Sequence, residues 1–210
     1  MSDSALMAGA FDGLAGTYDH DHHDAVARAL LDLAPPAAGD AVADVACGAG
    51  AVALRVASLR LPSSPAVLAV DLSEGMIAVG RALAERRGHA EAIEWRAGPA
   101  VPLPVADAAL DLILCASSLH FLGVRALADW RRALRPGGRI GFTLPLASQF
   151  RPSGVFADLV AWDLPLPEDA DQACSLAADA GFGDVRGRVV TVGTRAVVAV
   201  VASAPSNDSA

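Results

Sequence analysis

Residues 42–50, VADVACGAG, constrain the fold of this chain more than any other stretch. Residues 42–46 are small or β-prone around one acid, and two glycines then lead directly into the apolar run AVALRVASL. An apolar strand that ends in closely spaced glycines and opens a helix presents bare backbone amides and a helix N-terminus to a ligand. The stretch therefore predicts a binding turn for a nucleotide-like molecule.

The composition is that of one folded domain. Of 210 residues, 53% are hydrophobic and 19% are charged, which argues against a disordered chain. The formal net charge of −8 argues against a partner with a phosphate backbone, so we expect no nucleic acid. Cys47, Cys115 and Cys174 have neither paired nor metal-ligand spacing, which favours a reducing compartment.

The start of the chain, MSDSALMAGAFDG, lacks the basic and apolar regions of a secretory signal. No apolar run reaches the ~18 residues that would span a membrane. We therefore expect a cytoplasmic protein, monomeric or homodimeric, that does not enter a membrane.

Strand and helix patterns alternate along the chain. Strands are expected at residues 42–46, 67–70, 92–95, 110–116, 139–144, 185–192 and 195–202, and helices at 51–59, 73–88, 124–134 and 168–180. The last two strands flank Gly193 and Thr194, which is a two-residue hairpin signal. We expect an α/β fold: a Rossmann-like, doubly wound seven-stranded sheet with an antiparallel C-terminal hairpin and helices on both faces. It would form one domain over residues 1–205, with a disordered tail at 206–210.

The N-terminal residues 1–34 are expected to form a helical flap. A helix is predicted within residues 10–33, and Phe11, Leu14 and Tyr18 would make one apolar edge of the flap. The run HDHHD at 20–24 offers His20 and Asp24 as its only pair spaced four residues apart. Adjacent helical residues diverge, so we expect a solvated helix start with an aspartate cap, Asp21 or Asp24, rather than a metal site.

The glycine turn fits two classes of ligand. As a dinucleotide fingerprint, Gly48 and Gly50 have the required spacing, and Asp71 follows about 20 residues later to accept ribose hydroxyls. In the other interpretation the motif begins on the strand and reads Asp44-x-Ala46-x-Gly48-x-Gly50. A sheet that ends in an antiparallel hairpin is unusual for a dinucleotide-binding domain and favours the second interpretation.

This second motif resembles the first motif, D/E-x-G-x-G-x-G, of class I methyltransferases that use S-adenosylmethionine (SAM). Ala46 replaces the first glycine and adds a methyl group where the backbone approaches the ligand. Further stretches resemble the family's motifs in order: AVDLSEGMI (69–77), LPVADAALDLILC (103–115), SLHFL (118–122), RRALRPGGRI (131–140) and AGFGDV (180–185). Together they cover nearly the whole chain and are similar to the group that includes ubiquinone and menaquinone methyltransferases and many natural-product enzymes.

The resemblance implies a set of SAM-binding residues. The glycine turn would lie against the methionine tail and ribose, Asp44 would support the ammonium group, and Asp71 would accept both ribose hydroxyls. The alternative for Asp71 is a cap on the helix that begins at Ser73. Leu72 and Met76 would be apolar walls for the adenine, with a core role as the alternative for Met76. The expected cofactor-binding residues are Asp44, Ala46, Cys47, Gly48, Gly50, Asp71, Leu72, Met76, Pro99, Ala100 and Ser117.

The adenine end departs from the family. The family's G-D-A segment falls on residues 98–100, where Pro99 replaces the acid that usually meets the adenine amine. Proline offers neither a side-chain acceptor nor an N–H, but the Ala100 amide would still reach a ring nitrogen. We expect SAM binding to survive the loss of a hydrogen bond worth ~1 kcal/mol.

His120 follows the fourth predicted strand, where an acceptor would approach the methyl group. An imidazole suits a general base, and the alternative is that His120 only packs locally. The family's second histidine is a phenylalanine here. The expected walls of an apolar acceptor pocket are Tyr18, Phe121, Phe150, Phe156 and Trp162, contributed by the flap, the segment after the fourth strand and residues 145–167.

The sequence therefore predicts an enzyme that transfers a methyl group from SAM to a small, largely apolar organic acceptor, at oxygen, nitrogen or carbon, and without a metal. One alternative is a SAM-binding protein without methyl transfer, acting as a sensor or partner subunit. A third interpretation is an NAD(P)-binding reductase. The motifs do not identify the acceptor.

Overall fold

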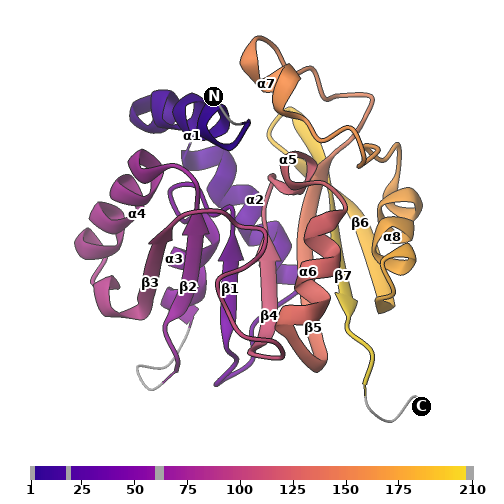
Figure 1. The fold of residues 1–210 in the computed structure, drawn as a ribbon, viewed down its shortest axis with the longest axis horizontal. Helices are drawn as coiled ribbons and strands as arrows, with labels where there is room; N and C mark the ends of the chain where they lie inside the picture. Colours follow the sequence, from indigo (N-terminus) through magenta and orange to yellow (C-terminus); the bar gives the residue numbers. More distant parts are fainter. Residues whose placement is uncertain (1–2, 18–19, 60–63, 207–210) are drawn as a thin grey trace.

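The computed structural model describes residues 3–17, 20–59 and 64–206. One seven-stranded sheet has the order β3-β2-β1-β4-β5-β7-β6 (Figure 1). The strands are β1 (Val42–Val45), β2 (Val67–Asp71), β3 (Ile93–Ala97), β4 (Leu110–Cys115), β5 (Leu134–Pro145), β6 (Gly183–Val192) and β7 (Arg195–Ser203). β1 to β5 pair in parallel, and β7 is antiparallel to β5 and β6. The predicted sheet and its C-terminal hairpin are confirmed.

Helices cover both faces of the sheet. They are α1 (Asp3–Leu14), α2 (His20–Leu33), α3 (Ala51–Leu59), α4 (Glu74–Arg86), α5 (Leu119–Leu122), α6 (Arg125–Ala133), α7 (Val155–Leu159) and α8 (Ala170–Asp179), with short 3-10 turns η1 (Ala15–Thr17) and η2 (Ala90–Ala92). One core cluster joins α2, α3 and α4 to one face, and another joins α5, α6 and α8 to the other. Successive side chains of β4 point to opposite faces of the sheet and therefore contribute to both clusters. Leu112 and Leu114 belong to the first cluster, and Ile113 and Cys115 belong to the second.

The N-terminal flap consists of two helices, where the sequence predicts one helix within residues 10–33. α1 ends at Leu14 and α2 begins at His20, because Gly13 and Gly16 weaken helix propensity between them. Asp21 lies inside the first turn of α2, so it is not the predicted cap. Asp24 also lies inside α2 and does not cap it. Its Oδ1 accepts a hydrogen bond from Arg55 Nε at 2.8 Å, which joins α2 to α3.

β5 begins at Leu134, five residues before the predicted start at 139. Leu134 already pairs with Leu110 of β4, and the register shifts before Leu112 pairs with Arg139. The intervening RPGG run contains Gly137 with φ of 74°. The prolyl-glycyl signal therefore produces an irregular extended start of the strand rather than a loop.

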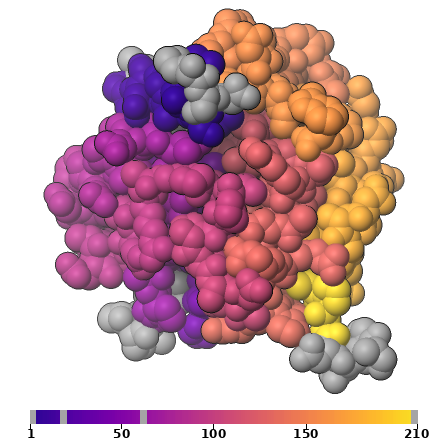
Figure 2. Space-filling model, viewed as in Figure 1, coloured from indigo at the N-terminus to yellow at the C-terminus, as the bar shows by residue number. Residues whose placement is uncertain are grey.

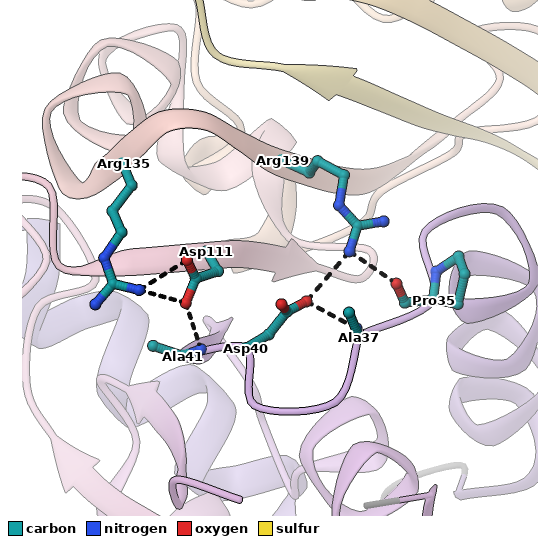
Figure 3. Close-up of polar contacts among 7 residues, drawn as sticks. All are labelled: Pro35, Ala37, Asp40, Ala41, Asp111, Arg135 and Arg139. Carbon is teal, nitrogen blue, oxygen red and sulfur yellow. Dashed lines mark hydrogen bonds and ion pairs between the residues drawn. The ribbon is translucent and has the colours of Figure 1, made fainter. Parts of the chain in front are cut away.

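Charged side chains join the amino ends of the central strands (Figure 3). Asp111 of β4 accepts a hydrogen bond from the Ala41 amide at 2.8 Å and from Arg135 of β5 at 2.6 Å. Arg139 donates to Asp40 at 3.2 Å. Such partly exposed pairs contribute modestly, ~0.2–1 kcal/mol each. They lie at the end of the sheet opposite the glycine turn.

The other end of the sheet carries the two segments expected to form a lid. α1 and the α7 region lie over the carboxyl ends of the strands (Figure 1). In the space-filling view, the indigo atoms of α1 and the orange atoms of the α7 region lie at this same end of the molecule (Figure 2). Ligands of doubly wound sheets bind at this end. Within the described ranges, no helix is long and apolar enough to cross a bilayer.

Candidate active site

The glycine turn connects β1 to α3. Its backbone has positive φ at Ala46 (51°), Gly48 (53°) and Gly50 (78°). Glycine adopts this left-handed region freely, whereas an alanine there costs about 1–2 kcal/mol. Ser118 Oγ donates a hydrogen bond to the Ala46 carbonyl at 3.2 Å. The turn is therefore held by the segment after β4, with Ala46 in a strained conformation.

Trp95 of β3 packs behind the turn. A β-carbon built on Gly50 would lie 2.3 Å from the Trp95 ring, and one built on Gly80 of α4 would lie 2.4 Å from it. Neither position accepts a larger residue without movement of the indole, because interiors are close-packed. The turn, α4 and β3 are thus fitted around one side chain.

Asp71, at the end of β2, lies beside the turn. Its Oδ2 accepts a hydrogen bond from the Gly48 amide at 2.7 Å, and its Oδ1 accepts one from the Ser73 amide at 2.8 Å. Burial raises the pKa of Asp71, and these two amide bonds oppose the shift. The Leu72 amide also acts on this carboxylate and lowers its pKa. Because a carboxylate has about four acceptor positions, Asp71 can still accept a hydrogen bond from a ligand. The predicted cap also forms, but through Ser73, whose Oγ accepts from the Met76 amide at 3.0 Å.

Asp44 is buried in β1, with 1% of its surface exposed. Its Oδ2 accepts a hydrogen bond from the Ala53 amide in the first turn of α3 at 2.9 Å. Burial raises the pKa of Asp44 to about 7, against the effect of that amide, and repulsion from Asp71 adds to the rise. A cation brought beside such a carboxylate stabilises its charged form. Asp44 therefore favours a positively charged ligand group.

A small cavity, here called the inner cavity, lies between the glycine turn and α1. It is lined by Met7, Phe11, Ala46, Gly48, Asp71, Leu72, Met76, Ala100, Ser118, Phe121 and Leu122. Its volume of about 40 Å³ holds only about three water molecules at ~10–15 Å³ each. Met7 and Phe11 of α1 occupy the space beside the turn.

Asp12 holds α1 in this position. Its Oδ1 accepts hydrogen bonds from Ser73 Oγ at 2.5 Å and from the Gly75 amide at 2.9 Å. The Ser73 bond and then the Gly75 bond lower the pKa of Asp12. An exposed acid of α1 therefore docks on the N-terminus of α4, where the helix dipole favours negative charge.

A larger cavity, here called the outer cavity, adjoins the inner one. Its volume is about 680 Å³, within the ~300–1,000 Å³ typical of small-molecule sites. Phe11, Ser118 and Phe121 line both cavities. A ligand in the inner cavity would therefore lie next to a ligand in the outer one.

Aromatic side chains form the apolar wall of the outer cavity. The Phe11 ring meets Phe121 edge to face with centroids 5.7 Å apart, and meets Phe156 with centroids 5.3 Å apart. Phe150 lines the same cavity. Three of the predicted acceptor-pocket residues, Phe121, Phe150 and Phe156, are thus brought together.

His120 of α5 lies among these rings. Its centroid is 4.1 Å from that of Phe121 and 4.9 Å from that of Phe150, and 4% of its surface is exposed. Burial lowers the pKa of His120 to about 4, so the imidazole is neutral at pH 7. Its Nδ1 has no hydrogen-bond partner in the described part of the chain. A neutral imidazole on the cavity wall can accept a proton from a bound molecule.

Comparisons with known proteins decide the family. Residues 42–138 match a family model described as a methyltransferase domain. The ubiquinone/menaquinone biosynthesis C-methyltransferase UbiE of Rubrivivax gelatinosus is 33% identical over 211 residues, covering 83% of this chain and 78% of that protein. The chain belongs to the class I SAM-dependent methyltransferases.

Other methyltransferases agree with this assignment. The UbiE protein of Dinoroseobacter shibae is 34% identical over 151 residues, and the aligned part is 65% of this chain but only 58% of that relative's length. The crystal structure of a SAM-dependent methyltransferase from Aquifex aeolicus has a TM-score of 0.63 at 22% identity, covering 85% of this chain and 89% of that one. This structural likeness shows the shared fold.

The methyltransferase site fits SAM by its chemistry. SAM carries ribose hydroxyls, from which the Asp71 carboxylate can accept, and positive charges, which the buried Asp44 favours. The inner cavity, however, has a volume of about 40 Å³ with α1 docked. A nucleoside needs far more space than this volume offers.

The predicted cofactor residues fall into three groups: those that line the inner cavity, one that lines the outer cavity, and those that line neither. Those lining the inner cavity are Ala46, Gly48, Asp71, Leu72, Met76 and Ala100, and Ser117 lines the outer cavity. Asp44, Cys47 and Gly50 are buried and line neither cavity. Pro99 is exposed and also lines neither. The preceding Gly98 amide donates to the Asp71 carbonyl at 2.8 Å, and the chain then turns so that Ala100, not Pro99, faces inward.

Two of the predicted acceptor-pocket residues remain, Trp162 and Tyr18. Trp162 does not line the acceptor pocket, which corrects the prediction, since 96% of its surface is exposed. The neighbouring Ala161 amide donates to the His120 carbonyl at 2.8 Å and Leu159 is buried, so the turn after α7 is anchored with Trp162 facing outward. Tyr18 lies outside the described residues.

Several residues that line the two cavities were not predicted from the sequence. Met7, Ser118 and Leu122 line the inner cavity, and Arg151 and Arg195 line the outer one. Ser118 falls within a recognised motif and was a detectable candidate. Arg151 lies in the segment after β5 and Arg195 is the first residue of β7, and no local pattern places them at one site.

Proposed function

We propose that this methyltransferase transfers the methyl group of SAM to a small, largely apolar acceptor bound in the outer cavity. The observation that carries the proposal is the shared wall: Phe11, Ser118 and Phe121 line both the inner and the outer cavity. Methyl transfer is an in-line displacement that requires donor and acceptor to adjoin and water to be excluded. The adjoining cavities and their phenylalanine walls meet both requirements.

The cofactor assignments rest on the position and charge of each residue. Asp71 accepts hydrogen bonds from the ribose hydroxyls, and Asp44 supports the positively charged tail. Leu72, Met76 and Ala100 form the walls of the adenine site. When bound, the cofactor supplies a methyl group on a positively charged sulfur.

His120 is the proposed general base. Its neutral imidazole accepts the acceptor's proton, if the methylated atom carries one, while Phe121 and Phe150 keep water away from the ring. The burial that lowers its pKa to about 4 makes it a weak base, so it suits an acceptor that loses its proton readily.

α1 and residues 145–167 together form the proposed lid. α1 contacts α7 through Phe11 and Phe156, and both segments lie over the carboxyl ends of the strands (Figure 1). A lid of this kind admits the ligands, closes, and excludes water during the reaction. We further propose a cytoplasmic monomer or homodimer without a nucleic-acid partner, supported by the unpaired cysteines and the net charge of −8.

Calorimetry tests the cofactor assignment directly. S-adenosylhomocysteine, NADH and NADPH are titrated into the protein, and we expect only the first to bind. Binding of a nicotinamide cofactor alone would refute the proposal. Transfer of tritiated methyl groups to a panel of phenols, naphthols and enolisable ketones then tests catalysis. Binding without transfer to any member, while relatives methylate the same panel, would favour a sensor or partner subunit.

A further inference from the structure

We propose that the acceptor carries a carboxylate, which Arg151 and Arg195 bind at the mouth of the outer cavity while its apolar body lies among the phenylalanines. This inference rests on the proposed function and names the chemical class of its acceptor. It adds a cationic anchor for the carboxylate to a cavity whose apolar wall is formed by phenylalanines.

The charge of the outer cavity is opposite to that of the chain. The chain has 24 acidic and 16 basic residues, all of the latter arginine. Among the described residues that line the outer cavity, none is an aspartate or glutamate, whereas Arg151 and Arg195 are cationic. An acidic protein thus presents a positive rim at one opening, which favours an anionic ligand there.

Arg151 is held in place by backbone groups. Its Nη1 donates to the Ala147 carbonyl at 3.0 Å and to the Phe150 carbonyl at 2.8 Å. No described carboxylate forms an ion pair with it. A guanidinium has five N–H donors, so Arg151 is fixed by one nitrogen and keeps donors on the others for a ligand.

Arg195 reaches the same opening from the hairpin. It is the first residue of β7, and the next residue, Ala196, donates its amide to Gln149 Oε1 at 2.8 Å. This bond ties the hairpin to the segment that carries Arg151. Arg195 and Asp21 both line a second surface depression, but no ion pair joins them in the described part of the chain. Arg195 therefore also retains its charge for a ligand.

The outer cavity has a cationic part and an aromatic part, and these two parts indicate the shape of the acceptor. A guanidinium matches the geometry of a carboxylate, and the outer cavity has two guanidinium groups on its lining. A single-ring or fused-ring body matches the Phe121, Phe150 and Phe156 walls. His120 lies among the rings, so the methylated atom lies on the apolar body. The carboxylate orients the acceptor and is not itself the reacting group.

The test compares isosteric probes that differ in charge. Calorimetry in the presence of saturating S-adenosylhomocysteine measures binding of 3-hydroxy-2-naphthoate and of its neutral amide, 3-hydroxy-2-naphthamide, at low salt. We expect the carboxylate to bind about tenfold more tightly to the wild type, as for a charge-assisted pair. The Arg151→Gln/Arg195→Gln variant should lose this preference. Arg186→Gln, which removes one charge from exposed β6, should keep it.

The outcomes separate this inference from the proposed function. Equal binding of the two probes to the wild type, no binding of the carboxylate, or a preference that survives the double substitution would overturn the inference. S-adenosylhomocysteine is titrated alone into every variant. Failure of that titration refutes the cofactor assignment, whereas normal cofactor binding with no carboxylate preference refutes only the cationic anchor.

Discussion

Asp12 Oδ1 lies 2.9 Å from the Gly75 amide nitrogen, so a carboxylate of α1 caps a helix that begins more than sixty residues later. A β-carbon on Gly75 would lie 2.9 Å from the same oxygen. The contact therefore depends on both residues. It keeps Met7 and Phe11 in the inner cavity.

Asp12→Ala should release α1. A cap contributes about 1 kcal/mol, so the population with α1 displaced should rise about fivefold. Association of S-adenosylhomocysteine, measured by stopped flow, should accelerate by a similar factor because α1 moves before the ligand enters. Gly75→Ala should act in the same direction. Gly13→Ala is the matched control, since its β-carbon would face open space. Unchanged association in both test variants would show that α1 is not a gate.

Asp71→Ala should weaken cofactor binding and loosen the glycine turn. Hydrogen bonds to a charged group contribute about 1.5–3 kcal/mol, so loss of about 2 kcal/mol corresponds to an affinity about thirtyfold lower. The variant also loses the Gly48 and Ser73 amide bonds, so its melting temperature should fall. Arg139→Gln, at the opposite end of the sheet, controls for stability. A variant that melts early but binds normally would leave Asp71 with a structural role alone.

Asp44 should make cofactor binding depend on pH. Its pKa is raised to about 7 in the folded protein, so between the unfolded value of about 3.9 and 7 the folded state binds more protons than the unfolded state. The contribution of Asp44 to stability therefore declines as pH rises through this window. A cationic tail should deprotonate Asp44 and release close to one proton at pH 6. Calorimetry in buffers of different ionisation enthalpy measures this release, which should vanish in Asp44→Asn.

Ala46→Gly should improve the cofactor site with little effect on folding. Glycine relieves the backbone at φ of 51°, worth about 1–2 kcal/mol, but gains about 0.4–1 kcal/mol of unfolded-chain entropy. The melting temperature should therefore rise slightly or stay the same. Removal of a methyl group from the inner cavity wall should tighten S-adenosylhomocysteine binding. Weaker binding would mean that the alanine side chain makes a useful contact.

His120→Ala should reduce turnover without reducing cofactor affinity. General-base catalysis typically contributes about 10²–10⁴-fold, and His120 lines the outer cavity only. Because its pKa is lowered to about 4, wild-type turnover limited by this group should be constant from pH 6 to 8 and decline as pH falls towards 4. Full turnover by the variant on an acceptor with an ionisable proton would exclude His120 as the base.

The sheet was predictable because its signals are local and repeated. Apolar runs in β4, the Gly193-Thr194 turn and the Ser73 cap each specify their own element, and the structure forms all three. The start of β5 was not predictable, since the RPGG run is compatible with either a loop or an extended irregular segment. Its pairing with Leu110 is a tertiary effect.

The candidate site, like the sheet, was predictable from the sequence only in part. Asp71, Gly48 and Met76 line the inner cavity because a sequence motif fixes their positions relative to the strand ends. The sequence of an irregular segment does not indicate which way its aromatic side chains point. Phe156 faces the cavity, whereas Trp162 faces solvent. The contact of Asp12 with Gly75 joins distant parts of the chain, and neither residue signals it alone.

The three tryptophans have three different surroundings. Trp130 is fully buried, Trp95 packs behind the glycine turn, and Trp162 is 96% exposed beside α7. An exposed indole emits at longer wavelength and is quenched by acrylamide, whereas a buried one is protected. Trp162→Phe and Trp95→Phe therefore separate the emission of the lid from that of the turn. Ligand arrival and lid movement can then be timed independently in the same protein, without an attached dye.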